Sequence, residues 1–113
     1  DEHGQIVIAD EVVAIIAGIA ATEVKGVDSM YGGWSGEIIS RMGIRDLSKG
    51  VSISIEDDHV SVKLSLNVKY GYSIPDVSRN VQDKVASAIE SMTGLSVLDV
   101  NIRIAGVVNA ENE

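Results

Sequence analysis

Residues 31–36 read YGGWSG and bring three glycines and one serine together with the only tryptophan of the chain. A glycine-rich loop can bind phosphate, a serine on a sharp turn can act as a nucleophile, and a tryptophan can anchor a partner. A phosphate-binding P-loop requires Gly-x-x-x-x-Gly-Lys-Ser/Thr, and no Gly-Lys-Ser/Thr occurs in the sequence. A nucleophile elbow requires glycine two residues before and two residues after the serine, but Glu37 follows Ser35 at that distance. The sequence therefore excludes both motifs.

Two interpretations of this segment remain open: a flexible loop with a partly buried Trp34, or a docking site for another protein. Tryptophan and arginine are frequent anchors of protein interfaces. Basic side chains also concentrate nearby, because residues 38–50 hold three basic residues and one acidic residue, a local charge of +2 in a chain of net charge −8. We therefore predict a partner-binding segment that consists of Gly32, Gly33, Trp34, Arg41, Arg45 and Lys49.

The other residues with chemical potential do not form a recognisable site. The two histidines, His3 and His59, are not spaced as metal ligands, and the acidic turn at 56–58 lacks the glycine and distal glutamate of a calcium loop. The chain has no cysteine, which excludes disulfides, zinc–thiolate centres and thiol catalysis. No pair of carboxylates stands inside an apolar run that would tune it for acid–base catalysis. We predict no catalytic residue, no metal site and no cofactor, and hence no enzyme.

The net charge of −8 opposes binding to nucleic acids and to anionic membrane surfaces, because both are polyanions. One face of the predicted sheet carries Lys63, Lys69 and Arg103, but it offers none of the exposed aromatic side chains on which single-strand binders stack bases. We therefore predict neither nucleic-acid binding nor direct membrane insertion. The acidic start is unlike a secretory signal, and the lack of cysteine suits a reducing compartment, so we expect a cytoplasmic protein.

The elements that would position these residues are clearest in the middle of the chain. Residues 51–56 and 59–70 alternate between apolar and polar side chains, which predicts a β-hairpin with one dry and one wet face. The predicted dry face of the second strand consists of Val60, Val62, Leu64, Leu66, Val68 and Tyr70.

A helix and a strand are predicted to follow the hairpin. Ser73 and Asp76 stand at capping-box spacing with Pro75 in the first turn, and Gly94 ends the apolar stripe that runs from Val77 to Met92. Residues 95–106 alternate again and predict a strand parallel to its predecessor. Its expected inward side chains are Leu98, Val100, Ile102 and Ile104.

The first helix, predicted at 11–25, is uncharged between Glu11 and Glu23 and apolar on every side. Such a helix is either buried or membrane-spanning, and its run of 11 residues is too short to span a bilayer. We therefore expect a buried helix, one side of which needs cover from a neighbouring element or another subunit. A buried strand at 5–9, a short strand at 27–31 and a short helix at 37–42 are also expected.

The predicted order is β-α-β followed by β-β-α-β. This order defines an α+β fold, a two-layer sandwich with a mixed sheet of about four or five strands and two main helices on one face. The chain of 113 residues is expected to form a single domain at 1–113, with an ordered core at about 4–107 and a flexible tail at 108–113.

The sequence resembles the alkaline shock protein family, also called the general stress protein family, of Gram-positive bacteria. The resemblance runs from about Gly4 to Val107 and is carried by AATEVKGV, YGYSIPDV with VQDKV, and MTGLSVLDVNI. Family members often have a hydrophobic or aromatic residue after paired glycines, as at Trp34 here, and basic residues near Arg41, Arg45 and Lys49.

The resemblance implies a small cytoplasmic protein that is not an enzyme. We expect a scaffold or adaptor in envelope or alkaline stress homeostasis that acts by self-association and by binding a membrane-anchoring protein. That partner would hold it near the membrane. The alternative that the family also implies is a regulator that binds carboxylase subunits and restrains acetyl-CoA carboxylase in fatty-acid synthesis.

Overall fold

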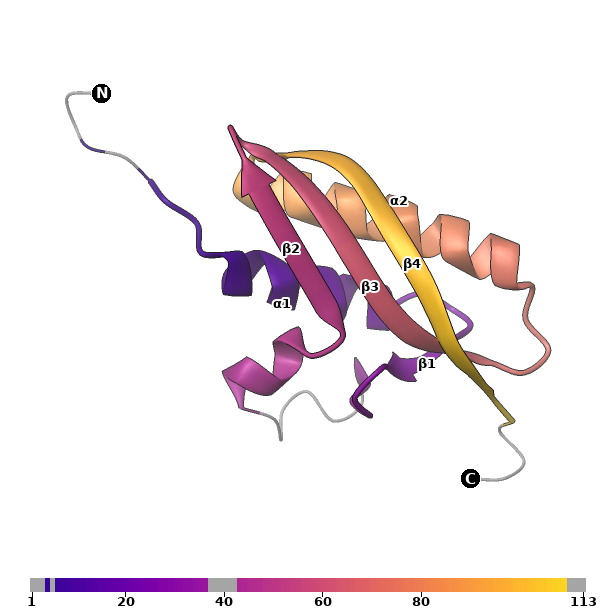
Figure 1. Cartoon of the computed structure of the whole chain (residues 1–113). Helices are drawn as coiled ribbons and strands as arrows, with labels where there is room; N and C mark the ends of the chain where they lie inside the picture. The colour runs from indigo at the N-terminus through magenta and orange to yellow at the C-terminus, as the bar shows by residue number, and fades with distance from the viewer. Residues whose placement is uncertain (1–3, 5, 37–42, 110–113) are drawn as a thin grey trace.

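The computed structural model describes residue 4 and residues 6–36 and 43–109. Two long helices and a four-stranded sheet form two layers, with both helices behind the same face of the sheet (Figure 1). This arrangement confirms the predicted α+β sandwich. In chain order the elements are α1 Asp10–Thr22, β1 Val27–Met30, the 3-10 helix η2 Ile44–Ser48, β2 Val51–Glu56, β3 His59–Lys69, α2 Ile74–Thr93 and β4 Ser96–Val108.

Strand β3 organises the sheet because all three other strands pair with it. β4 runs parallel along one of its edges, from the pair Ser96–His59 to the pair Val108–Lys69. On the other edge, β2 pairs antiparallel with the first half of β3, and β1 pairs antiparallel with the second half. The sheet is therefore mixed, as predicted. Gly50 lies where β1 and β2 meet end to end, and a Cβ atom there would approach the carbonyl oxygen of Tyr31 to 2.8 Å.

The core lies between the sheet and the two helices. The inward side chains of β3 are almost completely buried, and each such aliphatic side chain stabilises the fold by about 1.5–3 kcal/mol. Small residues on α1 and β-branched residues on α2 let both helices approach the sheet. The central buried residues are Val13, Ala17, Ala20 and Ala21 of α1, Val60, Val62, Leu64, Leu66 and Val68 of β3, and Val77, Val81, Val85 and Ile89 of α2.

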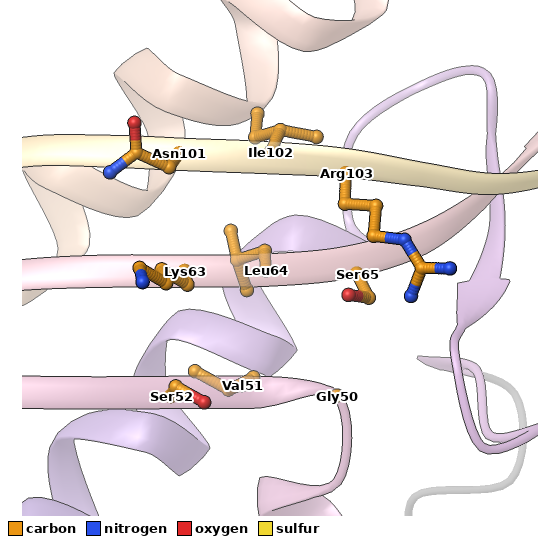
Figure 2. A pocket seen from close by; sticks show the side chains of 9 residues that line it. All are labelled: Gly50, Val51, Ser52, Lys63, Leu64, Ser65, Asn101, Ile102 and Arg103. Carbon is orange, nitrogen blue, oxygen red and sulfur yellow. The ribbon is translucent and has the colours of Figure 1, made fainter.

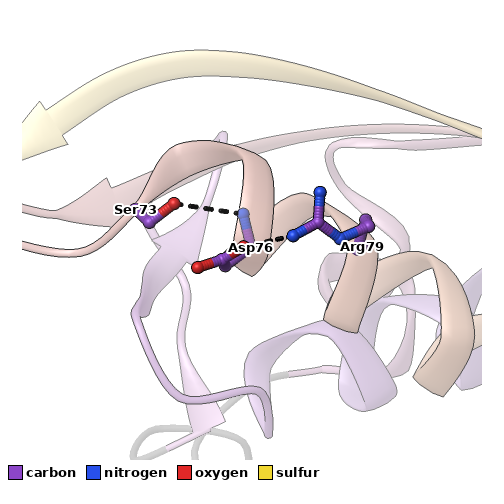
Figure 3. A network of polar contacts seen from close by, with 3 residues as sticks. All are labelled: Ser73, Asp76 and Arg79. Atoms are coloured by element: carbon purple, nitrogen blue, oxygen red, sulfur yellow. Dashed lines mark hydrogen bonds and ion pairs between the residues drawn. The ribbon is translucent and has the colours of Figure 1, made fainter.

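The ends of α2 follow the predicted capping pattern. The Ser73 side chain accepts a hydrogen bond from the backbone N–H of Asp76, whose carboxylate pairs with Arg79 (Figure 3). Gly94 ends the helix in the left-handed conformation, with a φ of 78°. Two side chains of α2 also reach the free edge of β4. Gln82 donates to the carbonyl of Val100 at 3.0 Å, and Glu90 accepts from the N–H of Val97 at 2.9 Å.

The predicted strand at 5–9 is wrong. Residues 6–9 lie outside the sheet, and the side chains of Ile6 and Val7 are 93% and 84% exposed. This segment pairs with no strand and runs directly into α1 at Asp10.

Helix α1 is shorter than predicted at its C-terminal end. It begins at Asp10 with Ala9 as N-cap, and Glu23 rather than Gly26 is its C-cap. Gly26 follows in a turn with a φ of 98°, and a Cβ atom there would lie 2.7 Å from Cγ2 of Val77 on α2. The turn therefore passes so close to α2 that only glycine fits at position 26.

Two apolar side chains that were expected on the inner face are exposed. Leu98 is 64% exposed because β4 has an extra residue at this point, between the pairs Val97–Val60 and Asp99–Ser61. Tyr70 follows the end of β3 and is also exposed. β4 reaches Val108, one residue into the predicted tail, and the predicted helix at 37–42 lies outside the described residues.

Two leucine substitutions test this assignment of inner and outer positions. Leu66→Ala is expected to lower the free energy of unfolding by about 2–5 kcal/mol, because Leu66 is fully buried and its loss leaves a cavity. Leu98→Ala is expected to change it by less than about 0.5 kcal/mol. Chemical denaturation measures both. A large loss for Leu98→Ala would mean that β4 lacks the bulge.

Candidate interaction surface

Trp34 lies inside the protein and not on its surface. The side chain is 1% exposed, its indole N–H donates to the carbonyl of Lys49 at 3.1 Å, and its ring lies against Gly18 of α1. A Cβ atom at position 18 would approach Cζ2 of the indole to 2.8 Å, so only glycine fits there. This burial favours the interpretation of Trp34 as a buried side chain of the loop, and its role in partner binding stays a prediction.

The other predicted partner-binding residues are only partly brought together. Gly32 and Gly33 form the turn after β1, with φ values of 116° and 90°, and both are exposed. Lys49 lies next to this turn, since a Cβ atom at Gly32 would be 3.3 Å from its Cβ, and its ammonium group pairs with Asp46 at 3.3 Å. Arg45 belongs to η2, and Arg41 lies outside the described residues. Partner binding by this segment stays a prediction.

The second surface of interest is the face of the sheet that neither long helix covers (Figure 1). Ser52, Lys63 and Asn101 form one row across β2, β3 and β4, since Ser52 and Asn101 are both paired with Lys63. Ser65 and Arg103 form the next row. These residues line a shallow hollow of about 390 Å³ that extends to Gly50 (Figure 2). We call the whole sheet face that neither long helix covers the open face.

The open face carries two cations that form no ion pair, and one acidic residue, Asp99, lies one row further along the same face, opposite Ser61. Lys63 and Arg103 are exposed, and neither takes part in an ion pair within the described part of the chain. The guanidinium carbon of Arg103 lies 5.9 Å from the ring centre of Tyr31, within the range of a cation–π contact. Tyr31 precedes the Gly32–Gly33 turn, so the open face continues into the segment that the sequence singled out.

Sequence reasoning found part of the open face and missed the rest. Strand alternation predicted Lys63 and Arg103 on the wet side, but it also predicted a face without aromatic side chains. The contact of Arg103 with Tyr31 corrects that expectation. It joins residues that are 72 positions apart in the chain (103 − 31), and no local pattern signals such a contact.

The acidic turn after β2 is a tight hairpin turn. Asp57 and Asp58 adopt positive φ angles of 49° and 64°, as a tight two-residue hairpin turn requires, and a ring nitrogen of His59 lies 2.7 Å from the carbonyl oxygen of Asp57. Within the described ranges, no three His, Cys, Asp or Glu side chains form a potential metal site. No helix in these ranges is long and apolar enough to cross a membrane.

The fold and this surface define a small two-layer α+β domain with one closed and one open sheet face. The chain belongs to the alkaline shock protein 23 family, which is described as having a cell envelope-related function and whose model matches residues 1–109. The resemblance noted in the sequence is thus confirmed.

Several relatives match nearly the whole chain. YqhY of Bacillus subtilis (strain 168) is 39% identical over 108 residues, which cover 95% of this chain and 80% of the relative. YloU of the same strain is 33% identical over 116 residues, with 94% and 90% covered. A protein named stress response regulator gls24 homolog, from Streptococcus pyogenes serotype M3, is 25% identical, with 96% and 62% covered. No solved structure matches the chain.

The burial of Trp34 leads to a stability prediction. Trp34→Ala is expected to lower the free energy of unfolding by about 3–5 kcal/mol, since it empties the space beside Gly18. Denaturation curves measure this loss. Trp34 is the only tryptophan, so the tryptophan fluorescence of the protein reports on its environment. Acrylamide is expected to quench this fluorescence weakly in the native state and strongly in denaturant. Strong quenching of the native protein would contradict the burial.

Proposed function

We propose that this protein is a non-catalytic adaptor in envelope or alkaline stress homeostasis, which acts by self-association and by binding a protein partner through the open face. The observation that supports partner binding is the pair of unpaired cations, Lys63 and Arg103, on a face that no helix covers. The description of the family as cell envelope-related and the name of the gls24 relative support the cellular role.

The charge distribution favours an acidic partner. The chain has a net charge of −8, so most of its surface repels an acidic protein. The open face offers two cations among hydroxyl and amide groups from Ser52, Ser65 and Asn101, which can donate or accept hydrogen bonds. An acidic surface would therefore be steered toward this face and away from the others. Electrostatic complementarity of this kind mainly sets the orientation and the rate of association.

The partner that we propose first is a membrane-anchoring protein, which would hold the adaptor in the cytoplasm close to the envelope. Subunits of acetyl-CoA carboxylase are the second candidate, as the family resemblance suggests. Both candidates require only a protein surface on this chain, and neither requires a catalytic group or a cofactor.

Charge reversal at the open face tests the proposal. Full-length Arg103→Glu is expected to recover its partner from native cells at least about tenfold less efficiently than the wild type, because the new carboxylate repels an acidic surface. Arg79→Glu on α2 is the matched control, since it changes the net charge equally and disturbs only an exposed ion pair. Quantitative mass spectrometry of the captured proteins measures both.

The identity of the depleted protein separates the two candidates. Selective loss of a membrane protein with Arg103→Glu supports the adaptor, and selective loss of carboxylase subunits supports the regulator. Equal capture by wild type and Arg103→Glu contradicts partner binding at the open face. If both variants lose the partner equally, capture depends on the net charge of the protein, and this result also contradicts partner binding at the open face.

A further inference from the structure

Helix α1 is also apolar on the side away from its fully buried residues, where three partly buried isoleucines pack against the core with part of their surface. Its buried residues, such as Val13, Ala17 and Ala20, face the sheet and α2. The apolar residues on its other side recur at intervals of three and four. We call them the outer stripe: Val12, Ile15, Ile16 and Ile19. Val12 is 48% exposed, and the three isoleucines are only partly buried.

A second exposed apolar group lies in the chain that precedes the helix, where Ile6, Val7 and Ile8 line a hollow with Ile55 and Leu95. Ile6 and Val7 are the most exposed large apolar side chains of the described residues, and Ile8 links them to the helix. No charged residue occurs from Val12 to Thr22. A partly exposed helix side without charges marks a contact site, because a solvent-facing helix side normally carries charged residues.

We propose that the outer stripe packs against the same stripe of a second copy of this chain, with the two helices antiparallel. The two-fold axis passes between Ile15 and Ile16, so that Val12 of each chain lies opposite Ile19 of the other. The proposal rests on the self-association in the proposed function and assigns a surface and an orientation to it. Such an isologous contact is closed and produces a dimer.

The charges at the two ends of α1 favour a second copy and the antiparallel orientation. Asp10 and Glu11 are exposed at the N-terminal end. At the C-terminal end, Glu23 and Lys25 are exposed, and Lys84 of α2 forms an ion pair with Glu23 at 3.7 Å. An antiparallel pair brings the acidic end of each helix to the end of the other that carries these lysines.

A parallel pair would instead place the acidic ends, Asp10 and Glu11, against each other. The helix dipoles favour the same choice, since their opposite partial charges meet only in the antiparallel pair. The occupant thus needs an uncharged apolar stripe with one acidic end and one end where Lys25 and the Glu23–Lys84 pair leave a single net positive charge. The outer stripe of this chain has that chemistry itself.

Single-cysteine variants test the orientation, because the natural chain contains no cysteine. Val12→Cys mixed with Ile19→Cys is expected to form a disulfide-linked dimer under mild oxidation. Val12→Cys alone is not, because the two copies of position 12 lie about 10 Å apart along the helix axis, seven residues at 1.5 Å each. Leu98→Cys, at an exposed site on β4, is the control for random collision.

A charge in the outer stripe tests the surface itself. Val12→Glu is expected to raise the dimer dissociation constant at least about a hundredfold, because dimerisation would then bury an unpaired carboxylate. The half-exposed position keeps the monomer folded, which circular dichroism verifies. Met92→Glu, at an exposed apolar site near the end of α2, is the matched control and is expected to leave the constant unchanged. Sedimentation equilibrium measures both.

The possible outcomes distinguish the inference from the proposed function. A wild-type protein that stays monomeric at all concentrations overturns self-association, and this inference with it. A wild-type dimer that Val12→Glu leaves intact overturns only the assigned surface. Efficient crosslinking of Val12→Cys with itself overturns the antiparallel orientation, whereas crosslinking only in the mixture, together with the weakened Val12→Glu dimer, supports the proposal.

Discussion

The structure depends on the pairing of β3 along both of its edges. One strand with five fully buried aliphatic side chains, from Val60 to Val68, holds β1, β2 and β4 in a single sheet. Because β4 is parallel to β3, the chain must cross over between them, and α2 makes that crossover on the inner face. The hydrogen bonds from Gln82 and Glu90 then protect the edge of β4 from unwanted strand pairing. The pairing with β3 thus decides which face of the sheet the helices cover and which face stays open.

The same constraint separates two surfaces of different chemistry. Both helices cover the inner face of the sheet, so the open face keeps the polar half of the alternating pattern, with Lys63 and Arg103. The outer stripe belongs to α1, which lies on the other side of the sheet, and is apolar. A small chain with few spare residues thus presents a hydrogen-bonding, cationic surface on one side and a hydrophobic one on the other.

Most of the fold could be predicted from the sequence because its signals are local. Period-two alternation gave β2 and β3, and the cap residues Ser73 and Gly94 gave both ends of α2. The failures depend on distant parts of the chain. The N-terminal run at 5–9 looks like a strand, but a strand also needs a pairing partner elsewhere in the chain, and residues 6–9 have none. Trp34 is buried because Gly18 leaves room for its ring and Lys49 accepts its N–H, and neither contact has a signature near Trp34.

The separation of the two surfaces bears on how an adaptor of this size could work. A partner bound to the open face would lie on the opposite side of the sheet from the outer stripe, so dimerisation through α1 would not block it. A dimer would then present two open faces to one membrane-bound or multi-subunit partner, and the second contact would form at a high effective concentration. Weak electrostatic contacts at Lys63 and Arg103 could thereby hold a partner firmly. Self-association and partner binding would then be two parts of one mechanism.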